Sequence, residues 1–235
     1  MPSAEKSSIS IFSHSRRQRD ECMIIERLGQ QHISVRCPAK LNLFLEVLGR
    51  RPDGFHEIAT IMQTVSIYDR LAIQTGGSGI EVTCSDPSVP SGPANLVWKA
   101  ADAVRRRAGR QCAPVRIAIH KTIPAGAGLA GGSSDAAGTI AGLNELWELR
   151  MPRQQMEEIG SQIGSDVPFF FTAGAAVCRG RGERVTPLPA RQAPLHFVVV
   201  YPGFQTPTGE VYQHLNLGLT PQDADDRISI LASRI

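Results

Sequence analysis

The chain has 235 residues, of which 42% are hydrophobic and 20% charged, and its formal net charge is +3. This length and apolar content are enough for a sizeable core, in one large domain or two modest ones. The small net charge does not by itself indicate a nucleic-acid or membrane partner. No apolar run approaches the roughly 20 residues of a membrane helix. The five cysteines form no C-x-x-C pair, so neither a zinc site nor a disulfide framework is predicted, and a reducing cytosol is the default setting.

Residues 1–22 differ in composition from the rest of the chain. They are rich in Ser and Arg and lack an apolar stretch followed by a small-residue cleavage site. The same composition would suit a transit peptide. The favoured interpretation is a disordered tail, or an over-extended start with Met23 as the initiator. Residues 1–30 are therefore predicted to be a disordered or mis-assigned extension.

From Ile33 onwards the pattern becomes regular. Residues 33–48 contain two β-rich runs separated by Pro38, and a proline inside such a run indicates an edge position or an interruption. Turn composition occurs at residues 50–54 and 76–80. Apolar runs and alternation predict further strands at residues 58–65, 71–73, 115–119, 175–179 and 196–201.

Three helices follow from the apolar spacing. The first begins at Asn95 and stops at Gly109, the second opens at Ser134, and the third follows Pro152 and ends near Gly164. The mixture is α+β, and its order of helices and strands is unlike a doubly wound Rossmann sheet.

A glycine-rich segment, PAGAGLAGGSSDAA at residues 124–137, joins a predicted strand to the second helix. Glycine has no Cβ, so the backbone N–H groups can approach a ligand closely. The following helix N-terminus adds unsatisfied donors and a positive dipole end, which together favour an anion and usually a polyphosphate. Ser133 and Ser134 can either cap the helix or place hydroxyls on phosphate or Mg²⁺. The alternative is a flexible turn, but the flanking strand and helix favour a phosphate loop. The segment matches neither a Walker A loop nor the dinucleotide fingerprint.

Residues 124–137 resemble the ATP-binding loop of the GHMP kinase superfamily. Three further stretches resemble the diphosphocytidyl-methylerythritol kinases: PAKLNLFL at 38–45, RPDGFH at 51–56 and GSDVPFF at 164–170, with GRGERVTPL at 180–188 continuing the match. The resemblance implies an α+β GHMP kinase fold. Its catalytic N-terminal domain, of the ribosomal protein S5 domain 2-like type, would span residues 31–195. An incomplete C-terminal α/β domain would begin within residues 196–235.

The resemblance also implies a catalytic pair, with Asp166 as the base and Lys40 as its partner. A kinase that acts on an alcohol needs a carboxylate to accept the hydroxyl proton and a cation to offset developing charge. Either residue alone is more often structural, and their joint occurrence in two signatures favours catalysis. ATP and Mg²⁺ are the implied cofactors, and no protein metal ligand is predicted. The residues expected to hold the nucleotide are Asn95, Pro124, Ala125, Gly126, Ala127, Gly128, Leu129, Ala130, Gly131, Gly132, Ser133 and Ser134.

Four residues are implied to bind the substrate. His56 would read a cytosine, and Asn42 would lie near the substrate hydroxyls. Phe55, where many family members have Tyr, would stack on the base, with Tyr212 on its other side. Each has a structural alternative, such as a surface imidazole or a core aromatic. Asn95 has one too, because it can cap its helix. Ala130 replaces a glycine that is common in the family's loop.

The implied reaction transfers the γ-phosphoryl group of ATP to the 2-hydroxyl of 4-diphosphocytidyl-2-C-methyl-D-erythritol, in the non-mevalonate route to isoprenoids. The expected partner is this small molecule, without nucleic acid or membrane, and a bacterial cytoplasm is favoured over a plastid. Two alternatives stay open: a GHMP kinase for another alcohol, and a truncated nucleotide-binding remnant or half of a complementing pair. Because family members continue further, the chain is expected to expose an apolar face that includes Ile228, Ile230 and Leu231.

Overall fold

The computed structural model describes residues 9–11, 22–109, 112–172, 174–190, 193–204, 211 and 224–232. Its main feature is an eight-stranded sheet with the order β1-β2-β3-β4-β6-β5, in which β7 pairs with β4 and β8 pairs with β7. All of these pairs are antiparallel except β5 with β6. The strands are β1 (Ile9–Ile11), β2 (Ile24–Gly29), β3 (His32–Arg50), β4 (His56–Thr75), β5 (Ile80–Cys84), β6 (Val115–His120), β7 (Ala175–Gly180) and β8 (Arg184–Pro187).

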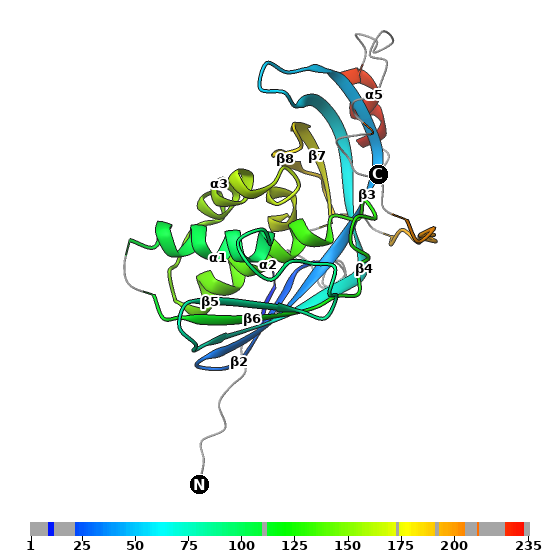
Figure 1. Ribbon diagram of the computed structural model, residues 1–235. Coiled ribbons are helices and arrows are strands. Elements are labelled where there is room, and N and C mark those ends of the chain that lie inside the picture. The colour runs from blue at the N-terminus through cyan, green and yellow to red at the C-terminus, as the bar shows by residue number, and fades with distance from the viewer. Residues whose placement is uncertain are drawn as a thin grey trace.

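Two long strands, β3 and β4, form a curved hairpin through the whole molecule (Figure 1). Strand β3 has 19 residues and β4 has 20, so the separate β-rich runs that the sequence predicts in each region belong to one continuous strand. Pro38 is an interruption, as expected, because the β3–β4 register shifts between Pro38 and Ala39. Strand β2 accompanies β3 only as far as Arg36. Pro38 therefore leaves no β2 carbonyl without a donor.

Helices α1 (Leu96–Arg107), α2 (Gly131–Leu146) and α3 (Arg153–Ile163) pack over the sheet, followed by the 3-10 helix η2 (Pro168–Phe171) (Figure 1). The predicted helices are confirmed, although α2 begins three residues before Ser134. Helix α2 lies very close to β3, because a Cβ on Gly138 would overlap the Cys37 Sγ atom. This close contact places the glycine-rich loop, at the start of α2, directly against the hairpin.

The N-terminal boundary lies earlier than expected. Cys22, Met23 and Ile25 are at most 2% exposed, and β2 pairs with β3. The predicted division at residue 30 therefore falls inside a hairpin, and the expectation of disorder is wrong for residues 22–30. Burial of these apolar side chains against the sheet favours the ordered state.

The expected strand at residues 196–201 is wrong. The segment is extended but pairs with no strand of the described part of the chain, and Val198 and Val200 are 93% and 83% exposed. Apolar composition favours an extended backbone, but a strand also needs a partner.

Helix α5 (Ala224–Ala232) corrects a second expectation. Ile228 is only 1% exposed, because it packs with Ala59, Ile61 and Val177 of the hairpin region. Leu231 packs against the same cluster, whereas Ile230 is 55% exposed as expected. The proposed domain division at residue 195 stays a prediction. Within the described ranges, no helix is long and apolar enough to cross a membrane.

Candidate active site

Lys40 and Asp166 lie side by side although they are far apart in the sequence. The Lys40 Nζ atom is 3.5 Å from the Asp166 Oδ2 atom, an ion-pair distance slightly longer than a direct hydrogen bond. The Lys40 side chain is only 5% exposed, whereas Asp166 is 28% exposed. A nearly buried ammonium group therefore faces a carboxylate that solvent and ligands can reach.

The backbone joins Lys40 to the glycine-rich loop. Lys40 N donates a hydrogen bond of 3.1 Å to the Leu129 carbonyl oxygen. Leu129 is buried with Ala39, Val65 and Ile123 in a small apolar cluster. The backbone of β3 just after the bulge at Pro38 thus lies against the middle of the loop.

The loop has the backbone conformation that its glycines allow. Gly126 and Gly128 have φ angles of 70° and 75°, in the left-handed region. Ala130, at the N-cap of α2, has a φ of 55°, also in the left-handed region. The Cβ of an alanine is strained there, whereas the glycine that is common in the family loop has no Cβ and no such strain. No side chain caps α2, so Ser133 and Ser134 do not have the first of the two roles that the sequence left open, which is to cap the helix. The first N–H groups of α2 are therefore left for water or for an anionic ligand.

Ser133 and Ser134 place two hydroxyls in the first turn of α2. The Ser134 Oγ atom is buried and has no hydrogen-bond partner among the described residues. Ser133 lies near the segment that carries Asp166, since a Cβ on Gly164 would be 3.8 Å from the Ser133 Oγ atom. The Ser134 hydroxyl, which has no partner in the described part of the chain and lies at a helix N-terminus, could donate a hydrogen bond to a phosphate oxygen or bind Mg²⁺ through its oxygen.

Asp166 lies between two tightly packed segments. Val167 N donates to the Gly164 carbonyl oxygen at 3.2 Å, which closes the turn after α3. From the other side, a Cβ on Gly182 would be 3.5 Å from the Asp166 Oδ1 atom. Burial, and then the charge of Asp166, raises the pKa of the Cys178 thiol to about 12. This thiol therefore stays protonated beside the pair at neutral pH.

The turn at residues 51–56 is held by ion pairs. The Arg51 guanidinium contacts Asp53 at 3.0 Å and Glu57 at 2.6 Å, and Phe55 N donates to the Asp53 carboxylate. The hydrogen bond from Arg51 is the main cause that lowers the pKa of Asp53. Phe55 itself is 47% exposed. Such an exposed, fixed ring can stack on a planar ligand.

The other expected substrate residues are on or near the same hairpin. His56 is half-buried opposite Arg50 at the end of the β3–β4 ladder. Asn42 is exposed on β3, and its Oδ1 atom accepts a hydrogen bond of 3.3 Å from the Thr60 hydroxyl. Tyr212 lies outside the described residues.

Comparison with known proteins agrees with this arrangement. Residues 95–174 match the family GHMP kinases N terminal domain. A 4-diphosphocytidyl-2-C-methyl-D-erythritol kinase of Citrifermentans bemidjiense is 46% identical over 188 residues, which are 80% of this chain and 66% of the relative. That of Syntrophomonas wolfei is 38% identical over 86% of this chain and 70% of the relative. The chain belongs to the 4-diphosphocytidyl-2-C-methyl-D-erythritol kinase family.

Solved structures give the same fold. A crystal structure of 4-(cytidine 5'-diphospho)-2C-methyl-D-erythritol kinase is 34% identical, with a TM-score of 0.66 over 86% of this chain and 71% of that one. Homoserine kinase from Cytophaga hutchinsonii, at 15% identity, has a TM-score of 0.63 over 87% of this chain and 66% of its own, and is similar in fold alone. The α+β GHMP kinase fold is thus confirmed. The chain spans about two thirds of the length of these family relatives.

Asn95, expected on the nucleotide side, has a structural role in α1. Its Oδ1 atom accepts from Val97 N at 2.8 Å, and its amide donates to the Pro90 carbonyl oxygen at 2.6 Å. The helix-cap alternative therefore accounts for both of its polar groups. A nucleotide contact by Asn95 stays a prediction.

Sequence reasoning missed a buried ionic cluster beneath the loop, which consists of Asp69, Lys121 and Asp135. Lys121 Nζ contacts the Oδ2 atom of Asp69 and lies 3.0 Å from that of Asp135, and all three side chains are at most 8% exposed. Asp69 Oδ1 also accepts hydrogen bonds from the N–H groups of Thr122 and Ile123, at 2.6 and 2.8 Å. The cluster therefore ties the entry of the loop to the first turns of α2. One signal in the sequence was available: the opposite charges of Lys121 and Asp135 lie on either side of the glycines of the loop.

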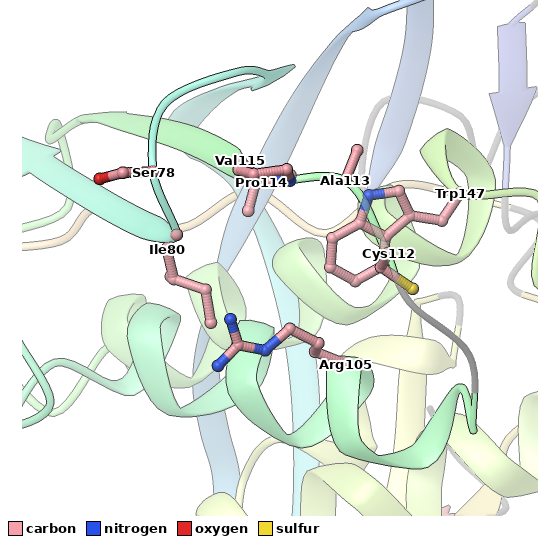
Figure 2. A pocket seen from close by; sticks show the side chains of 9 residues that line it. Ser78, Ile80, Arg105, Cys112, Ala113, Pro114, Val115 and Trp147 are labelled. Carbon is pink, nitrogen blue, oxygen red and sulfur yellow. The ribbon is translucent and has the colours of Figure 1, made fainter.

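A cavity of about 270 Å³ lies apart from this site. Figure 2 shows Ile80, Arg105 and Trp147 around it, from β5, α1 and the end of α2. Since the loop is at the other end of α2, and a 16-residue helix is roughly 24 Å long, the cavity is remote from the loop. Arg105 is already paired with Asp102 at 3.0 Å. The cavity has no part in the candidate active site.

Proposed function

We propose that this chain transfers the γ-phosphoryl group of ATP to the 2-hydroxyl of 4-diphosphocytidyl-2-C-methyl-D-erythritol. The observation that carries the proposal is the Lys40–Asp166 pair, which hydrogen bonds to the glycine-rich loop through the Lys40 backbone. Phosphoryl transfer needs little covalent chemistry from the protein beyond positioning, proton removal and charge stabilisation. The geometry supports all three at one place.

In this proposal Asp166 accepts the proton of the attacking hydroxyl. Its partial exposure leaves the carboxylate accessible, while the buried Lys40 ammonium stabilises charge that develops on the acceptor oxygen. The N–H groups at the start of α2 bind the phosphates, with the Ser133 and Ser134 hydroxyls as further ligands. Mg²⁺, when bound with the nucleotide, would neutralise phosphate charge.

Substrate recognition is assigned to the hairpin end. Phe55 stacks on the cytosine and His56 contacts its polar edge, while Asn42 lies toward the substrate hydroxyls. The exposed Phe55 ring, held by the ion-paired turn, supports this assignment. Tyr212 is proposed for the opposite face of the base from the family resemblance alone.

A substrate panel tests the proposal. ADP release is measured with 4-diphosphocytidyl-2-C-methyl-D-erythritol, with homoserine and with mevalonate, at equal concentrations of Mg²⁺ and ATP. We expect release with the first compound at a kcat/KM at least about 10⁴-fold above the others, because a site built to hydrogen-bond a base rejects compounds without one. Preferred turnover of another alcohol would instead assign a different GHMP kinase activity. Nucleotide binding without any turnover would support the remnant alternative.

A further inference from the structure

Arg181 is presented by a tight turn between β7 and β8. Gly180 and Gly182 flank it with φ angles of +77° and +113°, and Arg181 N donates a 2.6 Å hydrogen bond to the Glu183 carboxylate. A Cβ on Gly180 would lie only 2.7 Å from both Glu183 carboxylate oxygens. The turn therefore depends on glycine and fixes where the Arg181 side chain starts.

The Arg181 side chain connects parts of the candidate site that are distant in sequence. Its guanidinium carbon lies 4.6 Å from the centroid of the Phe55 ring, within cation–π range. Its Nη2 atom donates to the Ser161 carbonyl oxygen of α3 at 3.3 Å. The adjacent Gly182 lies against Asp166. One short turn thus contacts both the Phe55 turn and the segment of the proposed base.

This contact determines how Phe55 can receive a ligand. A guanidinium over one ring face covers that face and restricts rotation of the ring. Phe55 is nevertheless 47% exposed, so its accessible surface lies on the edge and on the other face. A ring restrained in this way loses less conformational entropy when a planar group stacks on it.

We propose that Arg181 is a specificity-determining residue, which holds Phe55 from one face so that the other face receives the pyrimidine base of a nucleoside-diphosphate substrate. The proposal rests on the proposed function, because that function supplies the base. Arg181 acts through Phe55 and is a positioning residue. Its loss should weaken binding of the base without affecting the ATP site.

The experiment measures binding of cytidine 5'-diphosphate by calorimetry, with a non-hydrolysable ATP analogue at saturation so that the nucleotide site is filled. We expect Arg181→Ala to weaken the Kd for cytidine diphosphate about three- to tenfold, the cost of ordering one unrestrained side chain on binding. Arg181→Lys should be intermediate, because an ammonium group keeps the cation but loses the planar stacking. Arg116→Ala is the matched control, since Arg116 is an exposed, ion-paired arginine on β6.

A double-mutant cycle separates action through Phe55 from a general effect of charge or stability. If Arg181 acts through the ring, Phe55→Ala combined with Arg181→Ala should bind no more weakly than Phe55→Ala alone. Additive losses, or an Arg181→Ala variant with wild-type affinity, would overturn the proposal. A wild-type protein that does not bind cytidine diphosphate would also overturn it. Turnover in the substrate panel is scored separately, so binding that behaves as expected without turnover would reject only the proposed function.

Discussion

Replacing Lys121 by Met tests the buried ionic cluster that supports the glycine-rich loop. Methionine keeps much of the length and apolar volume of lysine but removes the charge between Asp69 and Asp135. Two carboxylates, whose side chains are 0% and 3% exposed, would then share one buried site. Asp69 keeps its two backbone donors, whereas Asp135 would lose the ion pair from Lys121.

The expected cost is large for a single substitution. Removing one partner of a buried ion pair destabilises a protein by about 3–5 kcal/mol, because the remaining charge stays buried without compensation. For a chain of this size each kcal/mol lowers the melting temperature by about 2–4 °C, so Lys121→Met should lower it by roughly 10 °C. The KM for ATP should also rise, because the Asp69 bonds to Thr122 and Ile123 position the loop.

Thermal unfolding followed by circular dichroism measures this effect at pH 7.5. The exposed Lys99, on α1, supplies the control Lys99→Met, which should stay within about 0.5 kcal/mol of the wild type. Adding Asp135→Asn to Lys121→Met should recover part of the loss, because it removes the carboxyl group that has lost its ion-pair partner beside Asp69. If Lys121→Met is as stable as the wild type, or if adding Asp135→Asn lowers the melting temperature further, then Lys121 does not stabilise the two buried carboxylates.

Three further predictions concern the loop and α2. Burial raises the pKa of Asp135 to about 7, so the folded state takes up a proton that the unfolded state lacks between about pH 4 and pH 7. As the pH rises through that window, the stability that Asp135 contributes is lost. Asp135→Asn should therefore be more stable than the wild type at pH 8 but not at pH 4. If the two proteins differ in stability by the same amount at both pH values, the pKa shift is rejected. Ala130→Gly should leave stability unchanged or raise it by up to about 1 kcal/mol, because it relieves a left-handed alanine, and a clear loss in urea titration would contradict this. Gly138→Ala should cost about 1–3 kcal/mol by overlap with Cys37, and Cys37→Ala should restore part of that loss; additivity of the two would exclude the contact.

The helices could be predicted from the sequence, because their apolar spacing and end signals are local. Asn95 begins α1 and Gly164 ends α3, as their residue types suggest. The long strands could be predicted only in pieces, because the pairing of β3 with β4 across the Pro38 bulge depends on tertiary contacts. For the same reason the apolar residues at 196–201 were wrongly predicted to form a strand.

The candidate site, too, could be predicted from the sequence only in part. The glycine loop and the Lys40–Asp166 pair follow from motifs, and the structure brings them together. The charges of Lys121 and Asp135 beside the loop were a signal, but the cluster could not be derived from them, because its ion pairs span the fold and nothing local identifies Asp69 as a partner. The contact between Arg181 and Phe55 likewise depends on the pairing of β7 with β4.

The central claim is that Asp166, paired with Lys40, is the base for phosphoryl transfer. The most direct measurement compares kcat and ATP affinity of the wild type and Asp166→Asn, with 4-diphosphocytidyl-2-C-methyl-D-erythritol as the acceptor. Asparagine keeps the size and polarity of the side chain but cannot accept the proton, so kcat should fall about 10²–10⁴-fold. The Kd for ATP should change by less than about threefold, since the phosphates are bound by the loop. Near-normal turnover by Asp166→Asn would contradict the claim.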